Sequence, residues 1–210
     1  LEGRALLEWM AWCMAAPLFH LAAAGDGHPV LVLPGALSAR GQHIAEEFTG
    51  SCLMGVGQFC TNPGVAVVID GPEAEAFTAA AVAALTDTGA QTMLTAGIAS
   101  AFHQDRDRVS GTKGVREIMT STCDLRNATP YLFTTTAAEW LANEDLGEEV
   151  FGPLGMVVVA RDADEVLAVA KSLQGQLTCT LHMDDSDTDT ARNLMPVLER
   201  KAGRVLANGF

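Results

Sequence analysis

From Val30 onward, short runs of β-branched and aliphatic residues alternate with alanine-rich amphipathic segments. This alternation is typical of a parallel sheet, because parallel strands need long crossover connections that are usually helices. We therefore expect an α/β fold with a doubly wound, mostly parallel sheet and helices on both faces. The expected strands are Val30–Leu33, Val65–Ile69, Tyr131–Thr135, Met156–Ala160, Leu177–Leu181 and Arg204–Ala207. The expected helices are Ser38–Val56, Glu73–Asp87, Gly97–Arg108, Ala137–Leu141, Asp162–Leu173 and Ser186–Lys201.

The helix boundaries carry polar residues that commonly cap helices. Ser38, Asp162 and Ser186 each stand where an expected helix begins, and such side chains can accept a hydrogen bond from a free backbone N–H group. By contrast, residues 110–125 have weak periodicity and predict no element, apart from a turn at 111–114.

The composition excludes some partners. A chain of 210 residues with 49% hydrophobic content can bury a proper core, and its net charge of −13 gives it no electrostatic reason to bind nucleic acid. No stretch is long enough to span a bilayer, so no membrane partner is expected. The apolar stretch 5–19 predicts a buried helix rather than a secretory signal, because Glu2 and Glu8 interrupt the basic flank and Pro17 breaks the run.

The cysteines indicate a reducing compartment. Five cysteines, an odd number, are widely spaced and lack the CxxC or Cys/His spacing of a metal site, so we expect no metal and a cytoplasmic location. Only Cys60 lies in a loop whose glycines and proline bend the backbone, the segment Gly57–Gly64. A thiolate there would be a strong nucleophile toward a carbonyl carbon. From composition alone, a buried structural cysteine beside Phe59 is the stronger interpretation.

The loop containing Cys60 precedes its expected strand, Val65–Ile69. In a doubly wound sheet, ligands usually bind at the opposite edge, beyond the carboxyl ends of the strands. We therefore expect the thiol to face a ligand brought in by something outside this sheet, such as another domain.

Two segments carry a family resemblance. Gly57–Gly64 reads GQFCTNPG and resembles the nucleophile motif of the aldehyde dehydrogenase superfamily, in the form typical of the branch of α-ketoglutaric semialdehyde dehydrogenase and NADP-dependent fatty aldehyde dehydrogenase. Glu148–Pro153 is similar to the family's EEVFGP segment. The resemblance covers roughly residues 29–210 and implies the catalytic-domain fold of that family.

The resemblance implies roles for three residues. Cys60 would attack a small-molecule aldehyde or semialdehyde to form a thiohemiacetal, and a thioester would follow after hydride transfer to NAD or NADP. Glu149 would hold the nicotinamide ribose hydroxyls, and Phe151 would pack near the nicotinamide ring. On composition alone, Glu148 and Glu149 are instead a solvated pair and Phe151 is a core residue.

The sequence also departs from the family pattern. The family's general base falls in a Glu-Leu-Gly stretch, and the matching segment here, 21–28, has Ala23 near that position. Asp26 and His28 are nearby titratable groups that could substitute, although a satisfied or exposed loop residue is the stronger interpretation of a lone histidine. We therefore divide the chain into a divergent helical segment, 1–28, and an aldehyde dehydrogenase-like catalytic domain, 29–210.

Nothing in the chain resembles the family's dinucleotide-binding domain, and no GxGxxG motif occurs. The expected partners are thus a missing cofactor-binding domain or a second copy of the chain. An inactive fragment or remnant of an aldehyde dehydrogenase is the alternative.

Overall fold

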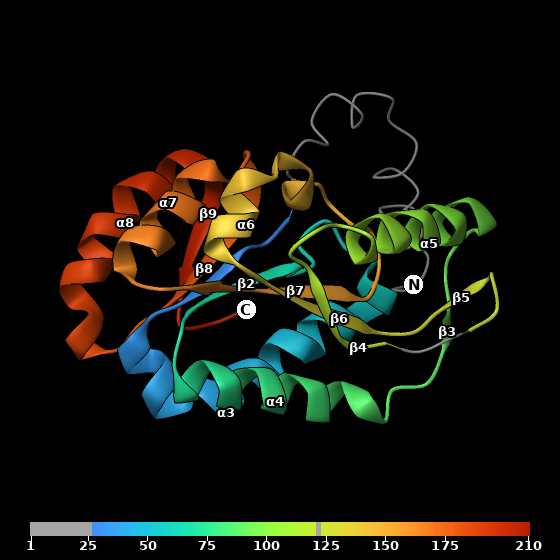
Figure 1. Ribbon diagram of the computed structural model, residues 1–210, viewed down its shortest axis with the longest axis horizontal. Helices are drawn as coiled ribbons and strands as arrows, with labels where there is room; N and C mark the ends of the chain where they lie inside the picture. The colour runs from blue at the N-terminus through green and yellow to red at the C-terminus, as the bar shows by residue number, and fades with distance from the viewer. Residues whose placement is uncertain (1–26, 121–122) are drawn as a thin grey trace, which may run out of the picture.

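The computed structural model describes residues 27–120 and 123–210. A seven-stranded sheet crosses the molecule, in the spatial order β4-β6-β7-β2-β1-β8-β9 (Figure 1). Every neighbouring pair is parallel except β4 and β6. Its strands are β1 (Val30–Val32), β2 (Val65–Ile69), β4 (Arg116–Met119), β6 (Tyr131–Thr136), β7 (Leu154–Ala160), β8 (Gln176–His182) and β9 (Ala202–Ala207).

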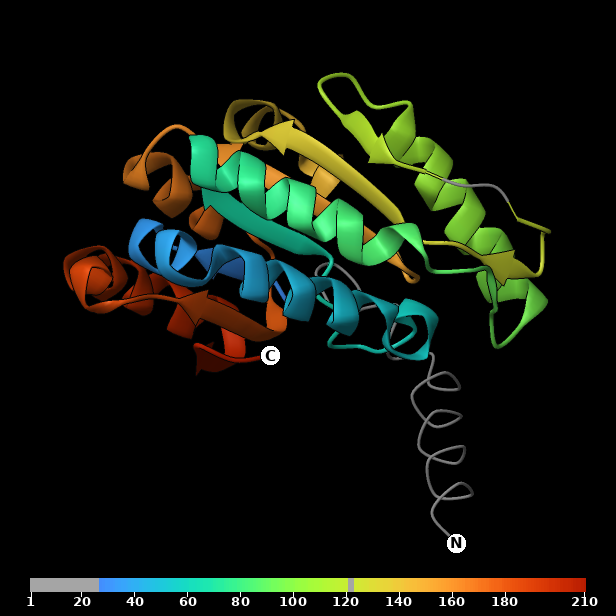
Figure 2. The same ribbon diagram turned by 90° about the horizontal axis from the view of Figure 1, so that it is seen from below.

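Helices cover both faces of this sheet. Helices α3 (Pro34–Leu53) and α4 (Pro72–Thr86) lie on one face, and α6 (Ala137–Ala142), α7 (Ala163–Ser172) and α8 (Thr188–Lys201) lie on the other (Figures 1 and 2). Helix α5 (Ala96–Ser110) lies toward the β4 side, next to a two-stranded sheet of β3 (Gln91–Thr92) and β5 (Asn127–Ala128). Short 3-10 helices occur at Met54–Gly57 (η1), Glu144–Gly147 (η2) and Asp185–Asp187 (η3).

The sheet separates two hydrophobic layers. Along β2, Val67 packs in the layer under α6, α7 and α8, whereas Ala66 and Val68 pack in the layer under α3 and α4. Successive side chains of a strand point to opposite faces, so an unbroken apolar run marks a strand buried on both sides. The predicted fold class, a mostly parallel α/β sheet with helices on both faces, is confirmed.

Two predicted helix starts are wrong. Helix α3 begins at Pro34 rather than at Ser38, because proline fits the first helical position and the Asp187 carboxylate accepts hydrogen bonds from the N–H groups of Gly35 (2.8 Å) and Ala36 (3.0 Å). Ser186 lies inside η3, whose cap is Asp184. The prediction for Asp162 is confirmed, since its side chain accepts from the N–H of Glu165.

The segment without predicted elements contains β4, the one antiparallel strand of the main sheet. Its exposed edge position explains the weak pattern, because Arg116 and Glu117 face solvent and only Ile118 and Met119 are half-buried.

The predicted segment 1–28 lies almost wholly outside the described residues, as do Ala23 and Asp26. Among residues 27–120 and 123–210, no helix has the length and apolar character needed to cross a membrane.

Candidate functional site

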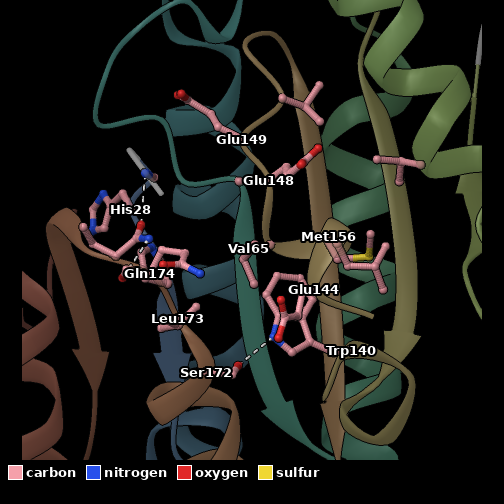
Figure 3. A pocket seen from close by; sticks show the side chains of 18 of the residues that line it. His28, Val65, Trp140, Glu144, Glu148, Glu149, Met156, Ser172, Leu173 and Gln174 are labelled. Carbon is pink, nitrogen blue, oxygen red and sulfur yellow. Dashed lines mark hydrogen bonds between the residues drawn. The ribbon is translucent and has the colours of Figure 1, made fainter. Parts of the chain in front are cut away.

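A cavity of about 210 Å³ opens at the edge of the sheet where the parallel strands begin (Figure 3). Pro29, Val65, Leu154 and Gln176 line it, and these residues stand at or just before the starts of β1, β2, β7 and β8. This is the amino edge, as expected from the place of Cys60 ahead of its strand. The usual ligand position in doubly wound sheets is the carboxyl edge.

The lining of the cavity combines apolar and polar side chains. Figure 3 shows Trp140 and Glu144 together at one end, Glu148 and Glu149 at the rim of the other end, and Val65 and Met156 between them. The Trp140 indole donates a hydrogen bond to Ser172 Oγ at 3.2 Å, which ties α6 to the end of α7. Side chains of His28, Asn62, Glu144, Glu148, Glu149, Gln174 and Gln176 supply the polar part of the lining. A pocket with a lining of both kinds suits a ligand that has apolar and polar groups.

The thiol sits on a tight turn. The N–H of Asn62 donates to the carbonyl of Phe59 at 2.9 Å, so Cys60 and Thr61 occupy the two central positions of a β-turn. Both residues are half-buried. The turn follows a strained stretch, since Gly55, Val56 and Gly57 all have positive φ, at 58°, 61° and 65°. For the β-branched Val56 this conformation is costly, and such strain often accompanies functional loops.

Gly57 brings the two sequence motifs into contact. A Cβ atom at this position would lie 2.2 Å from the carbonyl carbon and oxygen of Gly152, so only glycine allows this approach. The same carbonyl oxygen accepts a hydrogen bond from Asn62 Nδ2 at 3.1 Å. The loop with Cys60 and the segment with Glu149 and Phe151 are thereby held side by side.

Further hydrogen bonds, made by Gln58 and Cys52, hold the thiol loop in place. Gln58 accepts from the N–H of Leu94 at 2.9 Å and donates to the carbonyl of Gly55 at 2.8 Å. The Cys52 thiol donates to the carbonyl of Pro63 at 2.8 Å, and full burial raises the pKa of that thiol well above its ordinary value. Burial likewise raises the pKa of Cys179 to about 12. Cys52 and Cys179 are therefore unsuited to act as thiolates, because the thiolate is the reactive form.

The predicted site residues differ in their relation to the cavity. Glu149 lines it. Cys60 and Phe151 do not, although both are half-buried and lie in the two segments that border it. Asn62 and Gly64 connect the thiol loop to the cavity wall.

Helix α5 supports the acidic segment. Arg108 Nη1 donates to the carbonyl of Asp145 at 2.7 Å, and its Nη2 lies 3.4 Å from a Glu148 carboxylate oxygen. The pair with Glu148 contributes little, since that side chain is 62% exposed. The bond to Asp145 holds η2 against α5 and so fixes the wall from which Glu149 projects.

His28, one of the two groups that could substitute for the general base, is buried in the lining of the cavity. Its Nε2 lies 2.7 Å from Thr180 Oγ1 and its Nδ1 lies 3.3 Å from the carbonyl oxygen of Thr61. Burial lowers the pKa of His28 below its ordinary value, and the carbonyl of Thr61 partly opposes that change.

Sequence reasoning missed Asn62, Trp140, Arg108 and the glycine pair. The glycines at 57 and 152 were visible in the two motifs, but the contact between them joins residues far apart in the chain. Among the described residues, no cluster of three or more His, Cys, Asp or Glu side chains could hold a metal ion.

Comparisons with known proteins point to one group of enzymes. No protein-family model matches the chain. Over its whole length the chain is 44% identical to "Alpha-ketoglutaric semialdehyde dehydrogenase 2" of Azospirillum brasilense and 36% identical to "Alpha-ketoglutaric semialdehyde dehydrogenase" of Acinetobacter baylyi. It spans 40% of the length of each of these relatives.

Solved structures share the fold. An NADP complex of NADP-dependent glyceraldehyde-3-phosphate dehydrogenase from Bacillus halodurans matches 89% of this chain with 38% of its own, at a TM-score of 0.73 and 20% identity. A NAD-dependent benzaldehyde dehydrogenase from Corynebacterium glutamicum matches 88% of this chain with 40% of its own, at a TM-score of 0.69 and 18% identity.

Proposed function

The chain belongs to the aldehyde dehydrogenase superfamily, and we propose that it carries the reactive thiol of an enzyme that oxidises an aldehyde or semialdehyde with NAD or NADP. The observation that supports this most is the close approach of Gly57 to Gly152, because it holds the thiol motif and the acidic motif together beside one cavity. The names of the two relatives support α-ketoglutaric semialdehyde as the substrate.

In this proposal Cys60 is the nucleophile. Its thiolate attacks the aldehyde carbon, a C–S bond forms, and the carbonyl oxygen becomes the oxyanion of a thiohemiacetal. The backbone N–H of Cys60 donates to that oxyanion. Loss of hydride from the former aldehyde carbon leaves a thioester, and water cleaves the C–S bond to release the acid and the thiol.

The residues at the rim fit a nicotinamide cofactor. Ribose hydroxyls are hydrogen-bond donors, and the half-buried Glu149 offers carboxylate acceptors at the cavity. Phe151, half-buried next to Gly152, supplies an apolar surface for the nicotinamide ring. When bound, the cofactor accepts the hydride.

The proposal extends to organisation and location. Residues 29–210 form the catalytic domain, and a further domain or a second copy brings the cofactor to the amino edge of the sheet. The preceding segment, 1–28, is a separate divergent part. The absence of a disulfide between any two of the described cysteines supports a reducing, cytoplasmic setting.

The alternative is an inactive remnant, favoured by Ala23 at the position of the family's general base. Purified protein containing this chain separates the two hypotheses. We expect reduction of NAD+ or NADP+, followed by absorbance at 340 nm, to depend on α-ketoglutaric semialdehyde, and Cys60→Ser to lower the rate about 1,000-fold. Cys123→Ser is the matched control and should retain the wild-type rate.

Mapping the sites of iodoacetamide modification gives a second measurement. Cys60 should react faster than Cys123, and saturating aldehyde should protect it. Turnover by Cys60→Ser at the wild-type rate, or preferential modification of another described cysteine, would contradict the proposal. If Cys60 reacts fast and aldehyde protects it, but neither NAD+ nor NADP+ is reduced, the inactive remnant is the favoured hypothesis.

A further inference from the structure

His28 connects the thiol loop to the centre of the sheet. It immediately precedes Pro29 and β1, and its side chain is 3% exposed. One ring nitrogen meets the carbonyl oxygen of Thr61, the residue after Cys60, and the other meets the hydroxyl of Thr180 in β8. The hydroxyl of Thr180 also donates to the carbonyl of Gly209 at 2.9 Å.

These contacts require more protons than a neutral imidazole has. The carbonyls of Thr61 and Gly209 can only accept, so Nδ1 must donate to the first and the Thr180 hydroxyl must donate to the second. With its proton committed to Gly209, that hydroxyl can only accept from Nε2. All three hydrogen bonds therefore form together only when both ring nitrogens carry a proton.

A neutral His28 can form only one of two hydrogen-bond arrangements, depending on which ring nitrogen carries the proton. With the proton on Nδ1, the ring donates to Thr61 and the Thr180 hydroxyl turns to Nε2, leaving Gly209. With the proton on Nε2, the link to Thr180 and Gly209 is complete and the carbonyl of Thr61 loses its donor. The tautomer of His28 thus determines whether the carbonyl of Thr61, in the turn that carries Cys60, receives a hydrogen bond from the ring.

Several charged or titratable groups surround His28. Burial and the charge of Arg204 in β9 disfavour its protonated ring, whereas its contact with the carbonyl of Thr61 favours it. His182 in β8 is coupled to His28, and Glu144, Glu148 and Glu149 face the same cavity. The Phe210 ring packs near both histidines, with centroids at 6.1 Å from His28 and 5.1 Å from His182.

We propose that His28 is a positioning residue for the thiol turn, which donates from Nδ1 to the carbonyl of Thr61 and so sets the orientation of the backbone that presents Cys60. This inference rests on the proposed role of Cys60 as the nucleophile. It gives His28 a role other than that of a base for water, since both of its ring nitrogens already face protein groups.

Two amide substitutions separate the two ring nitrogens. The amide nitrogen of His28→Asn occupies the place of Nδ1 and can still donate to Thr61, whereas the amide nitrogen of His28→Gln occupies the place of Nε2 and reaches Thr180 instead. The rate of iodoacetamide modification of Cys60 is measured by peptide mapping, and Cys123 in the same molecules reports any general loosening. His43→Asn, at a side chain that is 66% exposed, is the control for loss of a histidine.

At pH 7.5 we expect iodoacetamide to modify Cys60 in His28→Asn at a rate within about twofold of the wild-type rate. In His28→Gln we expect Cys60 to react about tenfold more slowly, which is the effect of one lost hydrogen bond. Protonation of the Cys60 thiolate alone would lower the modification rate about tenfold for each pH unit. Below pH 6.5 the wild-type rate should fall less steeply than this, because protonation of His28 secures the hydrogen bond to Thr61. His28→Asn should show the full slope.

Equal Cys60 rates in His28→Asn and His28→Gln, whether both fast or both slow, would overturn the inference. So would identical pH slopes in wild type and His28→Asn. Failure of the proposed function gives a different result, namely a wild-type Cys60 that reacts no faster than Cys123.

Discussion

At the scale of single residues, the site depends on backbone positions that tolerate no side chain. Gly57 has φ of 65° and touches the backbone of Gly152. Gly152 in turn lies so close to Phe102 that a Cβ atom there would be 2.2 Å from the ring. The position of the thiol loop relative to the acidic segment therefore depends on two glycines, which pack against each other and against Phe102 in the core beneath α5.

Replacement of Gly57 by alanine tests this arrangement. The positive φ costs a non-glycine residue about 1–3 kcal/mol, and the clash with Gly152 adds to it, so Gly57→Ala should lower the free energy of unfolding by about 3 kcal/mol. Urea denaturation measures the change. Gly50→Ala is the matched control, since a Cβ there meets nothing within 4 Å and alanine favours the interior of α3. It should stabilise the chain by about 0.5–1 kcal/mol, and equal effects of the two variants would contradict the prediction.

At the scale of elements, helix α3 depends on a distant carboxylate. Asp187, 5% exposed in η3, accepts from the N–H groups of Gly35, Ala36 and Asp184. These donors include two at the start of α3 that have no partner within the helix. One buried side chain thus joins the start of α3 to the loop between β8 and α8.

We expect Asp187→Ala to lower the free energy of unfolding by about 1–3 kcal/mol, because it leaves buried N–H groups without acceptors. Thermal or urea unfolding checks the value. Asp189→Ala removes a carboxylate that is 93% exposed and pairs only with Arg192 on the surface, so its effect should stay within about 0.5 kcal/mol. A loss for Asp187→Ala no larger than that of its control would refute this account of the cap.

At the scale of the whole molecule, the buried histidines make stability depend on pH. His182 is 1% exposed, and within residues 27–120 and 123–210 neither of its ring nitrogens has a hydrogen-bond partner. Burial, and then the charge of Arg40, lower the pKa of His182 to about 4 from an ordinary value of 6.5. In the unfolded chain His182 takes up its proton near pH 6.5, whereas the folded protein resists doing so.

The unfolded state therefore binds more protons between pH 6.5 and about 4, and the contribution of His182 to stability is lost as the pH falls through this range. The loss is at most about 1.4 kcal/mol per pH unit, since one proton is involved. Urea unfolding of His182→Leu at pH 7, 6 and 5 should show a shallower dependence than the wild type. Parallel curves for His182→Leu and wild type would rule the mechanism out.

The sequence by itself determined much of this protein. The alternation of strand and helix patterns located six of the seven main strands, since an unbroken apolar run needs cover on both faces and that pattern is local. The missed strand, β4, lies at an edge and is half exposed, so it has no such pattern. The place of Cys60 ahead of its strand likewise predicted that the thiol loop lies at the amino edge of the sheet, whereas the cavity beside it was not predicted.

Only the tertiary structure decided how the site is assembled. The approach of Gly57 to Gly152, the hydrogen bond from Asn62 and the contacts of His28 with Thr61 and Thr180 join residues 33 to 152 positions apart. Such contacts follow from strand order and register, which local sequence does not encode. The start of α3 at Pro34 was decided in the same way, because the carboxylate of Asp187 is brought to α3 by the tertiary fold.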